Sequence, residues 1–320
     1  MIRLSGVGKT YADGTVAVHE LDLEVGRGEL TCLVGPSGCG KSTTLKMINR
    51  LIEPTTGTIE IDGVDVTRQD PVRLRRGIGY VIQQVGLFPH QKITANVMTV
   101  PLLYGESKAT ARERAHHLLD LVGLDPATYG DRYPHQLSGG QRQRVGVARA
   151  LAADPPVLLM DEPFGAVDPV VRVRLQDEFK RLQRDLGKTV VLVTHDIDEA
   201  VRMGDRVAVF ATGGRLAQYA TPAELLGHPA DEFVADFVGA ERGLRRLTVT
   251  AIDPAHLEPL EGISAGSLGA AIDLDSTLEE ALAVMLRDDK AMIGVKDGVR
   301  FVGVLTPNGV HRALRASLRH

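Results

Sequence analysis

Residues 35–42 have the composition and spacing of a loop that binds phosphate. They read Gly-Pro-Ser-Gly-Cys-Gly-Lys-Ser, follow an apolar run and precede a predicted helix over 43–51. Glycines let backbone N–H groups turn toward a phosphate, and the helix N-terminus adds the positive end of its dipole. Lys41 would then reach the β- and γ-phosphates of a nucleotide, and the Ser42 hydroxyl would bind Mg²⁺. The residues assigned to phosphate binding are Gly35, Pro36, Ser37, Gly38, Cys39, Gly40, Lys41, Ser42 and Thr43. The alternative is a glycine-rich turn that fits the pattern by chance.

Two adjacent acids, Asp161 and Glu162, follow the apolar run Val157–Met160. A carboxylate at the end of a buried strand can hold Mg²⁺, usually through water, and its neighbour can accept a proton from an attacking water molecule. We therefore assign Asp161 to the metal and Glu162 to the general base. Taken alone, two acids at a strand end also fit a solvated loop, and the phosphate loop in the same chain favours the catalytic interpretation.

A second short glycine-containing turn, Leu137-Ser138-Gly139-Gly140-Gln141, precedes a predicted helix over 142–151. Backbone donors and a helix dipole again point at one place, as an anion site requires. One chain therefore carries two helix starts that could each bind an anion.

The apolar runs beside these motifs predict an α/β core. Runs without polar alternation are expected for strands buried on both faces of a parallel sheet. They occur at 30–34, 157–160, 189–193 and 207–210, and helical patterns such as 170–186 lie between them. The first 25 residues alternate instead, which is typical of antiparallel strands with one solvated face. Helical patterns dominate from 94 to 151, so we predict a helical subdomain at about 85–155.

The α/β motifs end near Ala240, where we predict a domain boundary. A segment rich in Arg, Pro and Gly follows, and we interpret 241–262 as a linker. A compact strand–helix–strand–strand–helix pattern then predicts a small α+β domain. Its predicted pieces are a strand at 271–274, a helix at 277–287, strands at 291–295 and 301–305, and a helix at 307–317.

The two glycine-containing turns and the acid pair make residues 1–240 resemble the ATP-binding cassette (ABC) ATPases. The resemblance implies the α/β fold of a P-loop NTPase, with a mixed sheet core, an antiparallel β subdomain and a helical subdomain. The Leu-Ser-Gly-Gly-Gln turn is highly specific to that family and is unaltered here. The resemblance implies that Ser138, Gly139, Gly140 and Gln141 contact ATP bound to a second copy. Two copies would then meet head to tail as a homodimer, with two ATP molecules in the seam.

The other landmarks of the family follow in order along the chain. The resemblance implies that Tyr11 stacks on adenine, that Gln83 touches Mg²⁺ and the attacking water, and that Asp168 lies in the loop crossing the dimer seam. It also implies that His195 contacts the γ-phosphate. Taken alone, Tyr11 could also be a packed residue of a strand, and His195 could be a solvated residue of a loop. The presence of all these residues in the expected order favours the functional interpretation.

Two segments resemble the ATPase subunits of uptake systems for quaternary amines and related solutes: glycine betaine, choline, carnitine and proline. They are 47–57, with its Asn-Arg-Leu-Ile-Glu-Pro string, and 78–90, with its paired glutamines. The resemblance implies integral membrane permease subunits as partners, an extracytoplasmic solute-binding protein acting indirectly, and a peripheral place on the cytoplasmic face of the membrane. A sugar, anion or amino-acid importer subunit is the rival within this class.

The tail resembles one cystathionine-β-synthase (CBS) module, which many ATPases of this group carry as a tandem pair. We place the single module at 263–320, with its recognisable part from Ile263 to Ser317. Modules that bind adenosine ligands often have an Asp three residues after the Thr, whereas this chain reads Thr306-Pro307-Asn308-Gly309, which disfavours a nucleotide site. The tail could pair across the dimer or regulate it, and the alternative is a structural appendage.

Composition narrows the partners and the compartment. The formal net charge of −4 in 320 residues gives no basic face for nucleic acid. Cys32 and Cys39 are too few for a disulfide framework, which favours a reducing compartment.

No uncharged apolar stretch approaches the ~18 residues of a membrane span, so we expect a cytoplasmic chain. The other classes considered are a soluble ABC ATPase acting on nucleic acid or ribosomes, and a nucleotide-sensing regulator.

Overall fold

The computed structural model of the chain describes residues 1–82, 86–260, 268 and 270–317. It divides into two compact units, Met1–Tyr219 and Ala220–His320, and each unit is described by itself.

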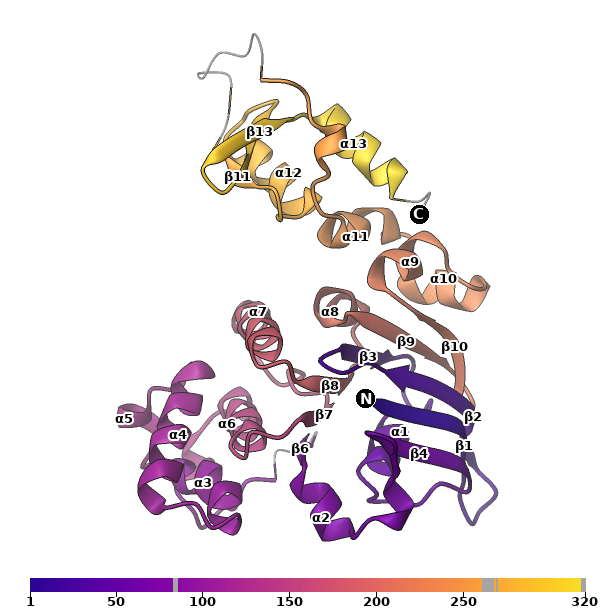
Figure 1. Ribbon diagram of the computed structural model, residues 1–320, viewed down its shortest axis with the longest axis vertical. Helices are drawn as coiled ribbons and strands as arrows, with labels where there is room; N and C mark the ends of the chain where they lie inside the picture. The colour runs from indigo at the N-terminus through magenta and orange to yellow at the C-terminus, as the bar shows by residue number, and fades with distance from the viewer. Residues whose placement is uncertain (83–85, 261–267, 269, 318–320) are drawn as a thin grey trace. The chain divides into compact units, whose positions relative to one another are not determined.

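The first unit is organised around a sheet that contains six strands within the described residues (Figure 1). Across the sheet these are β10 (Arg215–Ala220), β9 (Arg206–Ala211), β3 (Leu30–Val34), β8 (Thr189–Val193), β7 (Val157–Asp161) and β6 (Ile78–Val81). The pairs from β9 to β6 are all parallel. Every residue of β3, β7 and β8 is buried, which confirms the strands predicted from the continuous apolar runs.

An antiparallel sheet contains four strands in the described part of the chain: β2 (Val16–Val25), β1 (Ile2–Thr10), β4 (Thr56–Ile61) and β5 (Val64–Asp65). Helix α1 (Lys41–Ile48) contacts β2 of this sheet as well as β7 and β8 of the other. One apolar core joins the two sheets through that helix, with Leu21, Leu45 and Val191 among its fully buried members. Helix α1 and the loop before it are therefore held from both sides.

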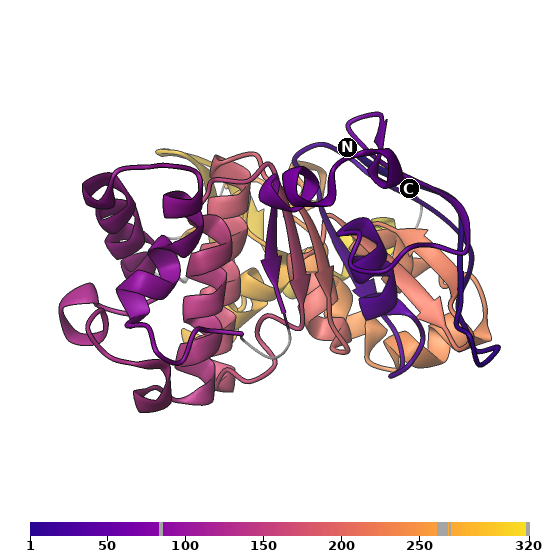
Figure 2. The ribbon, with the colours of Figure 1, turned by 90° about the horizontal axis from the view of Figure 1, so that it is seen from below.

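Helices fill the predicted helical subdomain. They are α3 (Ile93–Leu103), α4 (Lys108–Leu121), α5 (Pro126–Tyr129) and α6 (Gly139–Leu151). Figures 1 and 2 show them gathered on one side of the six-stranded sheet, with β1 and β2 on the other side. Helices α7 (Pro169–Asp185) and α8 (Ile197–Met203) contact each other, and α8 packs on β3. Helix α2 (Pro71–Arg76) lies next to β6.

Two helices begin earlier than the sequence patterns predict. Helix α1 begins at Lys41 because Gly40, with φ 94°, turns the chain directly into the first helical turn. Helix α6 begins at Gly139 because Ser138 caps it. The last residues of each motif, Lys41-Ser42 and Gly139-Gly140-Gln141, therefore form the first turn of the helix.

The second unit contains α9 (Pro222–Gly227), α10 (Glu232–Val238), α11 (Arg242–Val249), β11 (Ile272–Asp273), α12 (Leu278–Arg287), β12 (Ile293–Asp297), β13 (Arg300–Leu305) and α13 (Pro307–Ala316). The strands order as β11-β12-β13, parallel then antiparallel. This is the predicted strand–helix–strand–strand–helix order.

The division of the chain falls earlier than the boundary predicted near Ala240. The segment interpreted as a linker over 241–262 includes α11, which contacts α9 and α12. Its side chains Leu247 and Ile252 are buried in the same core as Ile293 and Val295. Arg and Pro in that segment suggested a linker, but the apolar residues between them pack. Residues 261–262 of this linker, and 263–267 at the start of the predicted module, lie outside the described residues.

Among the described residues, no helix combines the length and apolar character needed to cross a bilayer.

The two separate cores predict two unfolding transitions. Leu159 and Ile293 are both fully buried, one in each core. Replacing either by Ala should cost about 2–5 kcal/mol, from lost burial and the cavity left behind. By differential scanning calorimetry we expect Leu159→Ala to lower one transition and Ile293→Ala to lower the other. A single transition that both substitutions lower equally would contradict two compact units.

Candidate functional site

The phosphate-binding loop leaves the carboxyl end of β3, at the centre of the sheet, and enters α1. Two of its glycines pass close to other backbone: a Cβ on Gly35 would lie 2.3 Å from the Phe210 carbonyl oxygen, and one on Gly40 would lie 2.1 Å from that of Ala17. Gly40 also has φ 94°, in the region that favours glycine. Larger residues at these two positions would displace the loop.

Lys41 is buried at the start of α1, and its ammonium group lies inside the curve of the loop. Nζ donates to the carbonyl oxygens of Gly35 at 2.7 Å and Pro36 at 2.8 Å, and lies 3.5 Å from the Sγ atom of buried Cys39. Gly40, the N-cap of α1, has no side-chain oxygen, and the first turn of the helix carries no acid. The loop therefore combines a cation with a helix N-terminus that no side chain caps, as an anion site requires.

Ser42 and Asp161 bring two oxygen donors together beside this loop. The Ser42 hydroxyl donates to Oδ1 of Asp161 at 2.9 Å. Burial raises the pKa of the Asp161 carboxyl, and the hydrogen bond from Ser42 partly opposes that shift. A hydroxyl and a carboxylate next to a phosphate loop are oxygen donors of the kind Mg²⁺ prefers, so these residues fit the metal assigned to them.

Glu162 and His195 come from neighbouring strands and meet at the same edge of the sheet. Oε1 of Glu162 lies 3.3 Å from Nδ1 of His195. Glu162 follows β7 in a left-handed conformation with φ 48°, and its N–H donates to the Val193 carbonyl oxygen at 2.9 Å. The residue assigned as the general base and the histidine expected to contact the γ-phosphate are therefore within reach of each other.

A buried polar network behind His195 escaped the motif analysis. Glu199 is only 7% exposed; it accepts a hydrogen bond from the Thr194 hydroxyl and another from Nε2 of Gln176 at 3.0 Å. The Thr194 hydroxyl in turn accepts from the N–H of Asp196 at 3.0 Å. The turn that carries His195 is thus tied to α8 and α7. A glutamate in the first turn of a helix fits a favourable dipole contact, so nothing in the sequence alone indicates that it is buried.

The second glycine-containing turn forms a capping box at the start of α6. The Ser138 hydroxyl accepts from the Gln141 N–H at 3.2 Å, and Oε1 of Gln141 accepts from the Ser138 N–H at 2.9 Å. Gln141 also donates to the Tyr129 hydroxyl at 3.3 Å. Within one chain the two polar side chains thus hold each other, and Gly139 and Gly140 lie in the first turn.

Three other predicted residues are spread around the site or outside it. The Tyr11 ring is partly exposed, and its hydroxyl lies 3.5 Å from Oγ1 of Thr43 in α1, so it borders the phosphate loop. Asp168 caps α7, accepting from the Val170 N–H at 3.0 Å. Gln83 lies outside the described residues.

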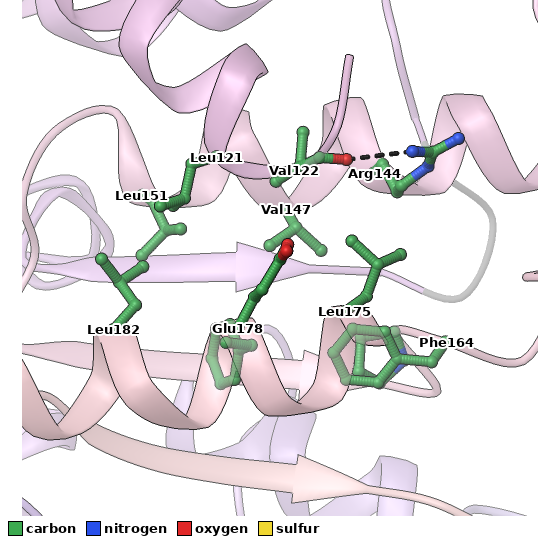
Figure 3. A pocket seen from close by; sticks show the side chains of 11 residues that line it. Leu121, Val122, Arg144, Val147, Leu151, Phe164, Leu175, Glu178 and Leu182 are labelled. Atoms are coloured by element: carbon green, nitrogen blue, oxygen red, sulfur yellow. Dashed lines mark hydrogen bonds between the residues drawn. The ribbon is translucent and has the colours of Figure 1, made fainter. Parts of the chain in front are cut away.

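A separate pocket lies between α4, α6 and α7 (Figure 3). Its lining is mainly aliphatic and aromatic, with Leu151 from α6 and Leu182 from α7 facing each other and Arg144 and Glu178 as its charged members. Arg144 donates to the Val122 carbonyl oxygen at 3.1 Å. Of the residues assigned to phosphate or metal that the structure describes, none lines this pocket.

Comparisons with known proteins point to one family. The family model described as ABC transporter matches residues 18–165. The chain is 51% identical over 285 residues to the glycine betaine/carnitine/choline transport ATP-binding protein OpuCA of Bacillus subtilis, covering 89% of this chain and 72% of the relative. It is 54% identical over 264 residues to the osmoprotectant import ATP-binding protein OsmV of Salmonella typhimurium, covering 81% and 69%.

A solved structure is similar in fold over about two thirds of the chain. It is described as the dimeric, post-hydrolysis state of the ATP-binding cassette MJ0796 bound to ADP and Pi. The match has a TM-score of 0.65 and 37% sequence identity, and covers 69% of this chain and 99% of that one.

The buried Glu199 predicts a pH-dependent stability difference. Burial raises the pKa of the Glu199 carboxyl, and the hydrogen bonds from Thr194 and Gln176 only partly oppose that shift. The native chain therefore holds this proton to higher pH than the unfolded chain, and the stability this gives at low pH is lost as pH rises through the native pKa. Glu199→Gln does not titrate, so its Tm relative to wild type should rise between acid and neutral pH in thermal melts. A Tm difference that stays constant or falls over that range would contradict a raised pKa.

Proposed function

Because the chain belongs to the ABC transporter ATP-binding protein family, we propose that it is the ATP-hydrolysing subunit of an importer for a quaternary amine or related compatible solute, such as glycine betaine, choline, carnitine or proline. The observation that carries the proposal is the meeting of the Lys41 loop, the Ser42–Asp161 pair and the Glu162–His195 pair at one edge of the sheet. The sequence identity of 51% and 54% to two ATP-binding proteins of such transport systems supports the solute class.

The loop and Lys41 hold the phosphates of ATP through backbone N–H groups and one ammonium group. Ser42, Asp161 and Gln83 would hold Mg²⁺, which supplies positive charge against the phosphate oxygens. Asp161 has to be ionised for this role, and a cation beside it favours the ionised form against the effect of burial. Tyr11 would stack on the adenine ring at the border of the loop.

Glu162 accepts a proton from the water that attacks the γ-phosphate. His195 lies 3.3 Å from the Glu162 carboxylate and contacts the γ-phosphate, so it holds the base and the phosphate at a fixed distance from each other. Gln83 responds to the same phosphate and leads into the helical subdomain. The products are ADP and inorganic phosphate, and the proton taken by Glu162 returns to solvent.

We further propose that two copies close head to tail on two ATP molecules. Ser138, Gly139, Gly140 and Gln141 of one copy would contact the γ-phosphate bound to the other, and Asp168 would lie in the seam. The start of α6 at Gly139, whose first turn carries no acidic residue, and the dimeric form of the solved relative support this arrangement.

Integral membrane permease subunits would bind the dimer, on the cytoplasmic face of the membrane, and carry the solute that an extracytoplasmic binding protein delivers. A single CBS-like module at 263–320 would either regulate the dimer or stabilise it. The sheet β11-β12-β13, parallel then antiparallel, with α12 after β11 and α13 after β13, is compatible with such a module.

Removing the base should separate ATP binding from hydrolysis. Glu162→Gln keeps the size of the side chain but cannot accept the proton at neutral pH, so we expect kcat to fall about 10²–10⁴-fold while ATP still binds and the dimer persists. Lys41→Ala, the control for binding, should lose ATP affinity. The measurements are phosphate release and equilibrium ATP binding. Near-normal turnover in Glu162→Gln would refute its role.

The solute can be identified by stimulation of hydrolysis. We expect the chain to copurify with a membrane permease and, in proteoliposomes, to hydrolyse ATP faster when a loaded quaternary-amine binding protein is present. Sugar- and amino-acid-loaded binding proteins serve as controls. Stimulation by one of those controls alone would reject the quaternary-amine assignment and leave the ATPase assignment standing.

A further inference from the structure

Gln143 has a buried amide whose nitrogen and oxygen are both hydrogen-bonded, at a place that the catalytic proposal does not use. It lies in α6 and is only 2% exposed. Its Nε2 donates to the Glu162 carbonyl oxygen at 2.6 Å, and its Oε1 accepts from the Ala166 N–H at 3.0 Å. Because one partner is a carbonyl and the other an N–H, the two bonds together fix which way the amide faces. The side chain therefore joins α6 to both ends of the turn that follows the proposed base.

That turn holds Glu162 in an unfavourable backbone conformation. With φ 48°, a residue other than glycine carries a cost on the order of 1–3 kcal/mol and keeps this conformation only when its surroundings impose it. On one side the Glu162 N–H donates to Val193 of β8; on the other its carbonyl accepts from Gln143 and, at 3.3 Å, from the Gly165 N–H. A hydrogen bond from α6 thus holds the peptide group of the residue that carries this carboxylate.

The first turn of α6 also packs on the same loop. A Cβ added at Gly140 would lie 3.1 Å from the Ala166 carbonyl oxygen and 3.3 Å from Cα of Val167. Arg172 of α7 also donates to the Val167 carbonyl oxygen at 3.0 Å. The loop from Glu162 to Val167 is therefore in contact with both helices, and a shift of α6 reaches it directly.

We propose that Gln143 is a positioning residue for hydrolysis: its amide fixes the Glu162 peptide so that the carboxylate meets the attacking water. This inference rests on the proposed role of Glu162 as the base. The same helix begins with Ser138 and Gln141, which are proposed to contact ATP on the other copy. One amide then links engagement of the partner's nucleotide to the alignment of the base at the chain's own nucleotide.

Gln143→Met tests the role because methionine keeps the length of the side chain but makes neither hydrogen bond. We expect kcat for ATP hydrolysis to fall about tenfold to a hundredfold, since a misplacement of about 1 Å can cost on the order of 100-fold. KM for ATP and equilibrium ATP binding should stay within about threefold of wild type, because the phosphate loop is untouched. Steady-state phosphate release and ATP binding give the two values.

Gln183→Met is the matched control for loss of a buried amide. Gln183 is also 2% exposed, and its Nε2 donates to the carbonyl oxygens of Gly28 and Lys188, each at 2.7 Å, away from the turn after β7. Both variants lose hydrogen bonds to backbone and should lower Tm by similar amounts, but Gln183→Met should keep kcat within about twofold of wild type. If kcat instead falls equally in the two variants, or stays at the wild-type value in Gln143→Met, the inference is overturned.

A double variant tests whether Gln143 acts through Glu162. If it does, Gln143→Met should cost almost nothing further in a Glu162→Gln background, because the group it positions is already gone. An additional tenfold loss of kcat in that background would overturn the inference. Normal turnover in Glu162→Gln alone would refute the base and the inference together, whereas normal turnover in Gln143→Met alone overturns only the inference.

Discussion

The parallel register of β3, β8 and β7 is the constraint on which the rest of the site depends. Leu33 pairs with Val193, and Val193 pairs with Asp161, so the three strands end at one level. The loop after β3, the acids after β7 and the histidine after β8 therefore emerge side by side, although about 120 residues separate the first from the second and about 30 the second from the third. Burial on both faces holds this register, because a strand made only of apolar residues has no polar face to expose.

The sequence predicted the buried strands well, because a strand that is buried on both faces consists of an uninterrupted apolar run. Glycines, a lysine and a hydroxyl in this fixed order fit little besides a phosphate loop, and the apolar runs at 30–34 and 189–193 match β3 and β8 residue for residue. The structure adds that Lys41 lies within α1 and that Ser138 and Gln141 cap α6. It places Cys39 in the interior, a burial that its position among glycines did not indicate.

What the sequence could not reveal depends on contacts between distant elements. Gln143 and Glu199 are polar residues on helices, where the default expectation is solvent, and only the packing of α6 and α7 beside the site buries them. The segment after Ala240 was interpreted as a linker from its Arg, Pro and Gly content, yet Leu247 and Ile252 contribute to a core whose other members come after residue 270. Composition describes a segment by itself, whereas a core is a property of segments far apart in the chain.

The central claim is that one edge of the sheet assembles a hydrolytic site completed by a second copy. The most direct measurement is a crystal or cryo-EM structure of the Glu162→Gln chain with ATP and Mg²⁺. The account predicts a head-to-tail dimer in which each γ-phosphate lies between Lys41 of one copy and the Ser138 turn of the other, with residues 162 and 195 facing it. ATP bound to a monomer, or to a dimer whose Ser138 turns lie away from the phosphates, would contradict it.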